Sequence, residues 1–89
     1  MTWTVIWQPR PLNDLASLWT DAASEERKNI ALASNAIDHK LHVNPEDAGE
    51  SRPLGRRILF HPPLGVFFEI REQDRMVVVT EVWRIPSRH

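Results

Sequence analysis

The chain has 89 residues and contains no cysteine and no tyrosine. The absence of cysteine excludes disulfides and thiolate metal ligands, and it fits a reducing compartment. No apolar run approaches the roughly 20 residues that a membrane-spanning helix needs. The first residues also lack the basic start and the small-residue cleavage site of a secretory signal. We therefore expect one cytoplasmic domain, residues 1–89, that does not associate with a membrane.

The charged residues are distributed unevenly, although the formal net charge is only −1. Residues 1–50 carry eight acids and four Lys or Arg, a balance of −4, whereas residues 51–89 carry seven arginines and four acids, a balance of +3. The planar fork of arginine suits phosphate, and it also suits the carboxylates of a partner protein. The second half therefore carries either an anion-binding face or arginines that simply cover an exposed sheet.

Residues 56–85 hold most of the β-branched and aromatic residues of the second half, in three runs. Two consecutive prolines separate the first run from the second, because proline donates no hydrogen bond to a strand ladder. A short polar turn separates the second run from the third and predicts a hairpin. A hairpin that closes symmetrically about this turn pairs Ile70 with Val77, Phe68 with Val79 and Phe67 with Thr80.

The first half of the chain predicts one strand and two helices. Residues 2–7 are β-branched and aromatic, which is typical of a strand at an edge or in the middle of the sheet. Asp21 or Ser24 is positioned to cap the second helix, whose first turn carries Glu25 and Glu26. Apolar residues recur at helical spacing in both helices: Leu12, Leu15, Ala16 and Trp19, then Ile30, Ala33, Ile37 and Leu41.

The element order is thus β-α-α-β-β-β, which predicts an α+β fold. We expect the two helices to form a hairpin that packs on a four-stranded antiparallel sheet. The buried sheet face should carry Val66, Phe68, Ile70, Val77 and Val79, covered by Leu15, Trp19, Ile30 and Ile37. The other sheet face is mixed in polarity and remains available to water or to a partner.

Standard catalytic and cofactor motifs are absent from the chain. It has no glycine-rich phosphate loop, no HExxH and no GxSxG. His39 and His42 are three apart in the second helix, but no third ligand is spaced with them, so we expect neither a metal site nor a cofactor.

Several segments of the sequence, taken in their order along a chain of this length, resemble the RelE/ParE toxin superfamily of bacterial type II toxin–antitoxin systems. The resemblance covers nearly the whole chain, although no single motif is diagnostic. The similar segments are Trp7-Gln8-Pro9, the following LNDLASLW, the ID-x-x-L of Ile37 to Leu41, Asn44-Pro45, Gly49, and the DR-x-V-x-V of the last hairpin. The resemblance implies a small cytoplasmic toxin of the plasmid-stabilisation type that a co-expressed antitoxin neutralises.

One branch of that superfamily cuts ribosome-bound messenger RNA with basic residues on the sheet face and a terminal tyrosine or histidine. By resemblance, the catalytic candidates here are Arg56, Arg84 and His89, and the RNA-binding candidates are Arg57, Arg71 and Arg88. The chain departs from that pattern because Ile58 is not basic, Gly65 stands near the place of an expected arginine, and no tyrosine is present. We expect Arg56 and Arg84, at the two ends of the three-strand run, to converge on one phosphate.

Two other functions fit the same resemblance. The second branch inhibits DNA gyrase without catalysis, and a degenerate member would bind its antitoxin but have no activity. The missing tyrosine and the scarcity of lysine on the strands favour these alternatives over an endoribonuclease.

Overall fold

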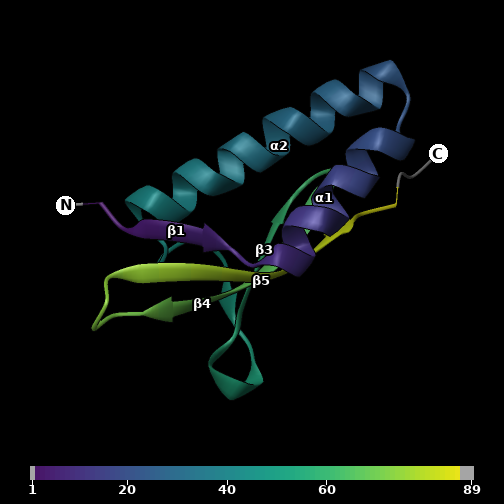
Figure 1. The fold of residues 1–89 in the computed structure, drawn as a ribbon. Coiled ribbons are helices and arrows are strands. Elements are labelled where there is room, and N and C mark those ends of the chain that lie inside the picture. Colours follow the sequence, from purple (N-terminus) through teal and green to yellow (C-terminus); the bar gives the residue numbers. More distant parts are fainter. Residues whose placement is uncertain (1, 87–89) are drawn as a thin grey trace.

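The computed structural model describes residues 2–86 of the chain (Figure 1). The elements follow in the order β1 (Thr4–Trp7), α1 (Pro9–Asp21), α2 (Ser24–Val43), β2 (Glu50–Ser51), the short 3₁₀ turn η1 (Pro53–Gly55), β3 (Arg57–His61), β4 (Leu64–Arg71) and β5 (Met76–Arg84). Neither helix is long and apolar enough to cross a bilayer. Figure 1 shows both helices on one side of the sheet.

The predicted α+β class and the helix hairpin are confirmed, whereas the sheet differs from the prediction in two details. It has five strands in the order β1-β5-β4-β3-β2 rather than four, because two residues of the connecting loop form β2 against β3. It is also mixed rather than purely antiparallel, because the edge strand β1 runs parallel to β5. The chain passes through both helices and three strands between β1 and β5, a path long enough for a parallel pair.

The hydrophobic core lies between the sheet and α2. Val66, Phe68, Val77 and Val79 are fully buried, as predicted, and α2 covers them with the predicted stripe of Ile30, Ala33, Ile37 and Leu41. Ile70 and Leu15 are only partly buried at the margin of this core. The prediction for Trp19 is wrong, because 44% of its surface is exposed. Arg27 covers the outer side of the Trp19 ring, 4.6 Å from the ring centroid.

The start of α2 also differs from the prediction. Ala23 occupies the N-cap position, and no side chain caps the helix, so neither Asp21 nor Ser24 has that role. Glu25 and Glu26 lie in the first turn as predicted. There they face the positive end of the helix dipole.

A β-bulge interrupts the pairing of β4 with β5. Phe68 lies opposite Val79, as predicted, but Phe67 lies opposite Glu81. The extra residue is Thr80, so the predicted pairing of Phe67 with Thr80 is wrong. Side chains alternate between the two faces of a strand, and one inserted residue therefore exchanges the faces of every residue after it.

Phe68→Ala should lower the free energy of unfolding by about 3–5 kcal/mol, because it removes a fully buried ring from the centre of the core. Phe60→Ala is the matched control, since the Phe60 ring is 53% exposed and should cost about 1 kcal/mol or less. Urea denaturation of both variants measures the difference. Equal losses in the two variants would show that Phe68 is not central to the core.

Candidate functional site

The arginines predicted from the sequence lie at two different ends of the sheet. Arg57 is opposite Phe68 near the start of β3, whereas Arg84 is opposite Leu64 at the far end of β5. Because β3 and β5 both run antiparallel to β4, they point the same way, and the start of one lies far from the end of the other. The predicted convergence of Arg56 and Arg84 on one phosphate is therefore wrong.

The bulge places Arg84 on the helix side of the sheet. Its guanidinium forms an ion pair with Glu26 in the first turn of α2. This contact ties the end of β5 to the start of α2 and gives Arg84 a structural partner. The two other predicted residues near the C-terminus, Arg88 and His89, lie outside the described residues.

A basic hollow forms at the opposite end of the sheet, where β3 begins and β4 ends. Its volume is about 390 Å³, and its walls include Glu46, Arg52, Arg56, Arg57 and Glu72. Two of the predicted residues, Arg56 and Arg57, thus lie together. Arg52 was not predicted, although its place five residues before Arg57 in an arginine-rich segment is a signal for it. The predicted Arg71 ends β4 nearby and lies 4.0 Å from Glu69.

The arginines of this basic hollow are engaged to different degrees. Arg57 donates hydrogen bonds to the carbonyl oxygens of Glu46 and Gly49 and to the hydroxyl of Ser51, at 2.8, 3.1 and 3.0 Å, so it mainly holds the loop before β3. Arg52 pairs with Glu50 at 3.2 Å on the surface. Arg56 stacks over Phe67, 4.5 Å from the ring centroid, and forms no ion pair with any residue in the described range 2–86. Of the three arginines of the hollow, Arg56 is therefore the one most available to an anion.

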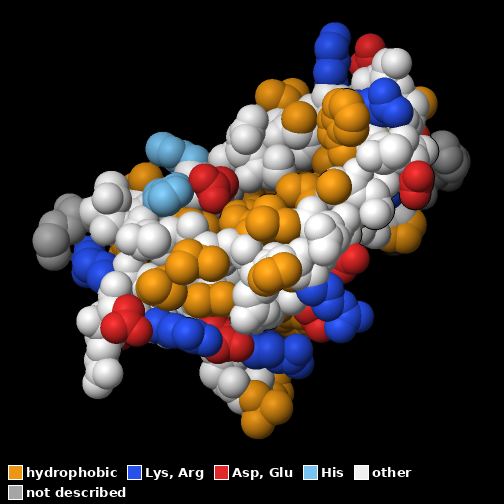
Figure 2. All heavy atoms as spheres, viewed as in Figure 1, with side chains coloured by type: hydrophobic (Ala, Val, Ile, Leu, Met, Phe, Trp, Pro, Cys, Tyr) orange, Lys and Arg blue, Asp and Glu red, His pale blue; other side chains and the backbone are white. Residues whose placement is uncertain are grey.

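An apolar groove lies between the two helices, and the sequence did not predict it. It has a volume of about 320 Å³ and is lined by residues that include Leu12, Leu15, Trp19 and Ile30. Leu12 is 50% exposed, and Figure 2 shows hydrophobic side chains gathered on the face formed by the helices and β1. The apolar stripe of α1 was the sequence signal for it, and two members of that stripe, Leu12 and Trp19, stay exposed. We call this the helix groove; exposed apolar surface of this kind is typical of protein-binding sites.

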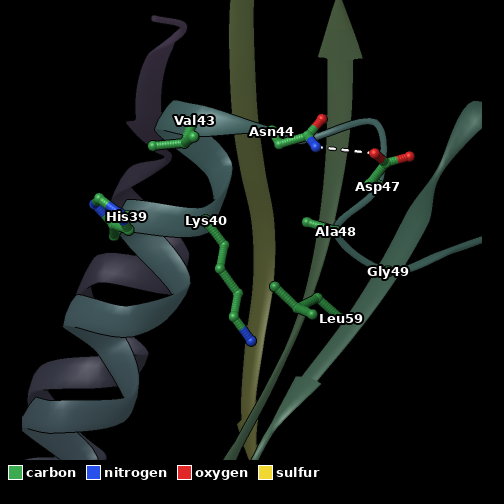
Figure 3. A pocket seen from close by; sticks show the side chains of 8 residues that line it. All are labelled: His39, Lys40, Val43, Asn44, Asp47, Ala48, Gly49 and Leu59. Atoms are coloured by element: carbon green, nitrogen blue, oxygen red, sulfur yellow. Dashed lines mark hydrogen bonds between the residues drawn. The ribbon is translucent and has the colours of Figure 1, made fainter.

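A second hollow, of about 340 Å³, lies between the end of α2 and β3 (Figure 3). Its walls include Lys40 and Leu59, and the side chains of Asn44 and Asp47 are joined by a 2.9 Å hydrogen bond. His42 makes structural contacts at the same end of α2, where Nδ1 lies 2.7 Å from the carbonyl oxygen of Trp3 and Nε2 lies 3.3 Å from Asp38. Within residues 2–86, no group of three or more His, Asp or Glu side chains could hold a metal ion.

Comparison with known proteins relates this architecture to solved structures. The ParE–ParD toxin–antitoxin system of Pseudomonas aeruginosa matches at 16% identity and a TM-score of 0.74, over 94% of this chain and 97% of that one. The RelBE2 toxin–antitoxin complex of Mycobacterium tuberculosis matches at the same identity, TM-score and share of this chain, and over 99% of the other. The chain has the RelE/ParE toxin fold.

The isolated RelE toxin of Escherichia coli shares this fold with a TM-score of 0.58 at 11% identity, over 98% of this chain and 88% of RelE. No family model matches the sequence, and no curated protein matches it either. The resemblance expected from the sequence is thus confirmed at the level of the RelE/ParE fold. At such low identity, the shared fold does not distinguish messenger cleavage from gyrase inhibition, so the target must be argued from the positions of individual side chains.

Proposed function

We propose that this protein is the toxin of a type II toxin–antitoxin pair and that its basic hollow binds ribosome-bound messenger RNA in the cytoplasm. The observation that carries the proposal is the RelE/ParE fold, which the chain shares over 94% of its length with proteins from two toxin–antitoxin systems. The hollow supports an RNA target because three arginines line it. Arginine recognises phosphate through paired N–H donors.

In this proposal, Arg56 is the principal phosphate ligand and Arg52 assists it. Arg56 has no carboxylate partner in the described range, so an approaching phosphodiester does not have to displace one. Arg57 acts mainly by holding the loop on which Arg52 lies. If the bound RNA is cleaved, a guanidinium close to the scissile phosphate stabilises the charge that develops on its oxygens. His89 as acid or base and Arg88 as an RNA ligand stay predictions from the sequence, because both lie outside the described residues.

The second candidate function is inhibition of DNA gyrase by binding alone. It is favoured by the distance between Arg56 and Arg84 and by the ion pair that Arg84 makes with Glu26. A binding toxin needs no cluster of catalytic groups, so this separation does not count against it.

The proposal predicts that Arg56→Ala lowers messenger cleavage by about 100-fold or more, the usual effect of removing a group that stabilises charge in a transition state. Arg84→Ala should leave cleavage nearly unchanged, because Arg84 faces α2. The protein is expressed from an inducible promoter without antitoxin, and messenger 5′ ends are mapped. Arg10→Ala is the charge-matched control, since Arg10 is exposed on α1.

Cleavage at the parental rate in a folded Arg56→Ala variant would contradict the assignment of RNA binding to the basic hollow. A parent protein that cuts no messenger but stabilises gyrase–DNA breaks would replace the RNA proposal with gyrase inhibition. Growth that continues normally while the parent protein accumulates would reject the toxin itself.

The proposed antitoxin would occupy the helix groove with an apolar helical or extended segment. From the sequence, the mixed sheet face and a sheet edge were the expected antitoxin surfaces, with acidic groups of the antitoxin meeting the arginines; the exposed apolar side chains of the helix groove favour the groove instead. Leu12 and Trp19 protrude there, and exposed apolar patches of this kind are typical of protein-binding sites. Trp19 is also the residue type most often found to dominate binding energy.

Leu12→Ala should weaken binding to the protein encoded next to this gene by about 10-fold or more, because Leu12 is exposed in the free protein and the bound antitoxin segment would bury it. Leu32→Ala should change the affinity by less than about 2-fold, since Leu32 is also an exposed leucine of the helix hairpin (67%) but does not line the helix groove. Isothermal titration calorimetry with each purified variant gives the dissociation constants. The groove assignment fails if both variants bind like the parent, and the antitoxin proposal fails if the parent does not bind.

A further inference from the structure

The sheet face that the helices leave uncovered carries a row of aromatic side chains with an arginine at one end. Phe60 on β3 and Trp83 on β5 both lie beside Gly65 of β4, and their rings meet edge to face with centroids 6.2 Å apart. Phe67 lies 5.0 Å from Trp83 on the other side, and Arg56 stacks over Phe67. The row therefore runs Phe60, Trp83, Phe67, Arg56.

Gly65 is what allows the indole of Trp83 to lie against the sheet. A Cβ atom at Gly65 would come within 2.7–2.8 Å of three atoms of the Trp83 ring, closer than non-bonded atoms approach. The ring thus fills the space that a side chain at this position would take. Trp83 is held flat by β4 and flanked by two other rings, so its orientation is fixed before any ligand arrives.

Arg56 connects this aromatic row to the basic hollow. It covers Phe67 at the end of the row and also lines the hollow with Arg52 and Arg57. Phe60, at the other end, is 53% exposed although it is a large apolar side chain on a strand. A ring that is open to solvent and a guanidinium with no carboxylate partner in the described range therefore share one surface.

We propose that Phe60 and Trp83 form a stacking platform for unpaired nucleobases, with Arg56 holding the phosphodiester backbone beside it. Aromatic side chains bind single strands because every base presents a flat π-face, while arginines along the same groove follow the backbone charge. A duplex cannot use such a platform, because its bases are stacked inside the helix. The inference rests on the proposed function and names the part of the RNA that the aromatic row contacts.

The test measures binding of a fluorescein-labelled eight-nucleotide single-stranded RNA, its DNA counterpart and the corresponding duplexes, by anisotropy at low salt. The parent should bind the single strands at least 10-fold more tightly than the duplexes. Phe60→Ala should weaken single-strand binding by between about 5-fold and 150-fold, the range for loss of one base stack. Arg56→Ala should weaken single-strand binding and also make the affinity less dependent on the salt concentration. Leu32→Ala, which removes an exposed apolar side chain from the helix side, should bind like the parent.

Trp83→Phe provides a second readout, because it keeps a ring on the platform but removes the indole. Unlabelled RNA should quench the tryptophan fluorescence of the parent and of the Trp19→Phe control, and it should quench that of Trp83→Phe much less. Equal binding of duplex and single strands, or an unchanged affinity of Phe60→Ala, would overturn the platform.

The binding assay contains no ribosome, so its result is independent of messenger cleavage. A protein that binds the single strands but never cuts messenger would retain the platform and lose the nuclease proposal. A protein that cuts messenger while Phe60→Ala binds like the parent would retain the nuclease and lose the platform. A preference of more than about 10-fold for RNA over DNA would identify RNA as the strand that the platform takes.

Discussion

The pairing of β4 with β5, including the bulge at Thr80, is the constraint on which the rest of the structure depends. Both β1 and β3 pair with this hairpin, and its apolar face supplies Phe68 and the valines that α2 covers. Before the bulge the faces follow simple alternation from the turn. After the bulge the two faces are exchanged. This brings Val82 and Arg84 to the helix side and Trp83 to the uncovered face.

That exchange divides the molecule into two surfaces with different chemistry. Arg84 leaves the uncovered face and pairs with Glu26, while Trp83 joins Phe60 and Phe67 there. The uncovered face then combines flat rings with the basic hollow, which suits a flexible polyanion. The helix side offers an apolar groove at Leu12 and Trp19, which suits a protein segment.

Much of this fold was predictable because short-range rules decide it. The polar turn and alternating apolar residues gave the correct pairing of Phe68 with Val79, and helical spacing gave the buried stripe of α2. The bulge was not predictable, because Thr80 fits a regular strand as well as a bulge. The prediction for Arg84 failed because the bulge turns this side chain to the helix side. It also failed because β3 and β5 run in the same direction, so the start of β3 and the end of β5 lie at opposite ends of the sheet. Trp19 was misassigned because periodicity identifies the apolar stripe of a helix but not how much of it the sheet can cover.

The central claim is that the bulge determines which side chains beyond Thr80 face the helices. The chain has no cysteine, so single cysteines can report on each position without a background signal. The Glu81→Cys variant should react with a thiol reagent as fast as an unfolded peptide, whereas Val82→Cys should react only through rare opening, because Val82 is buried. Fast reaction at position 82 and protection at position 81, in folded variants, would show that β5 continues without a bulge and would contradict the account.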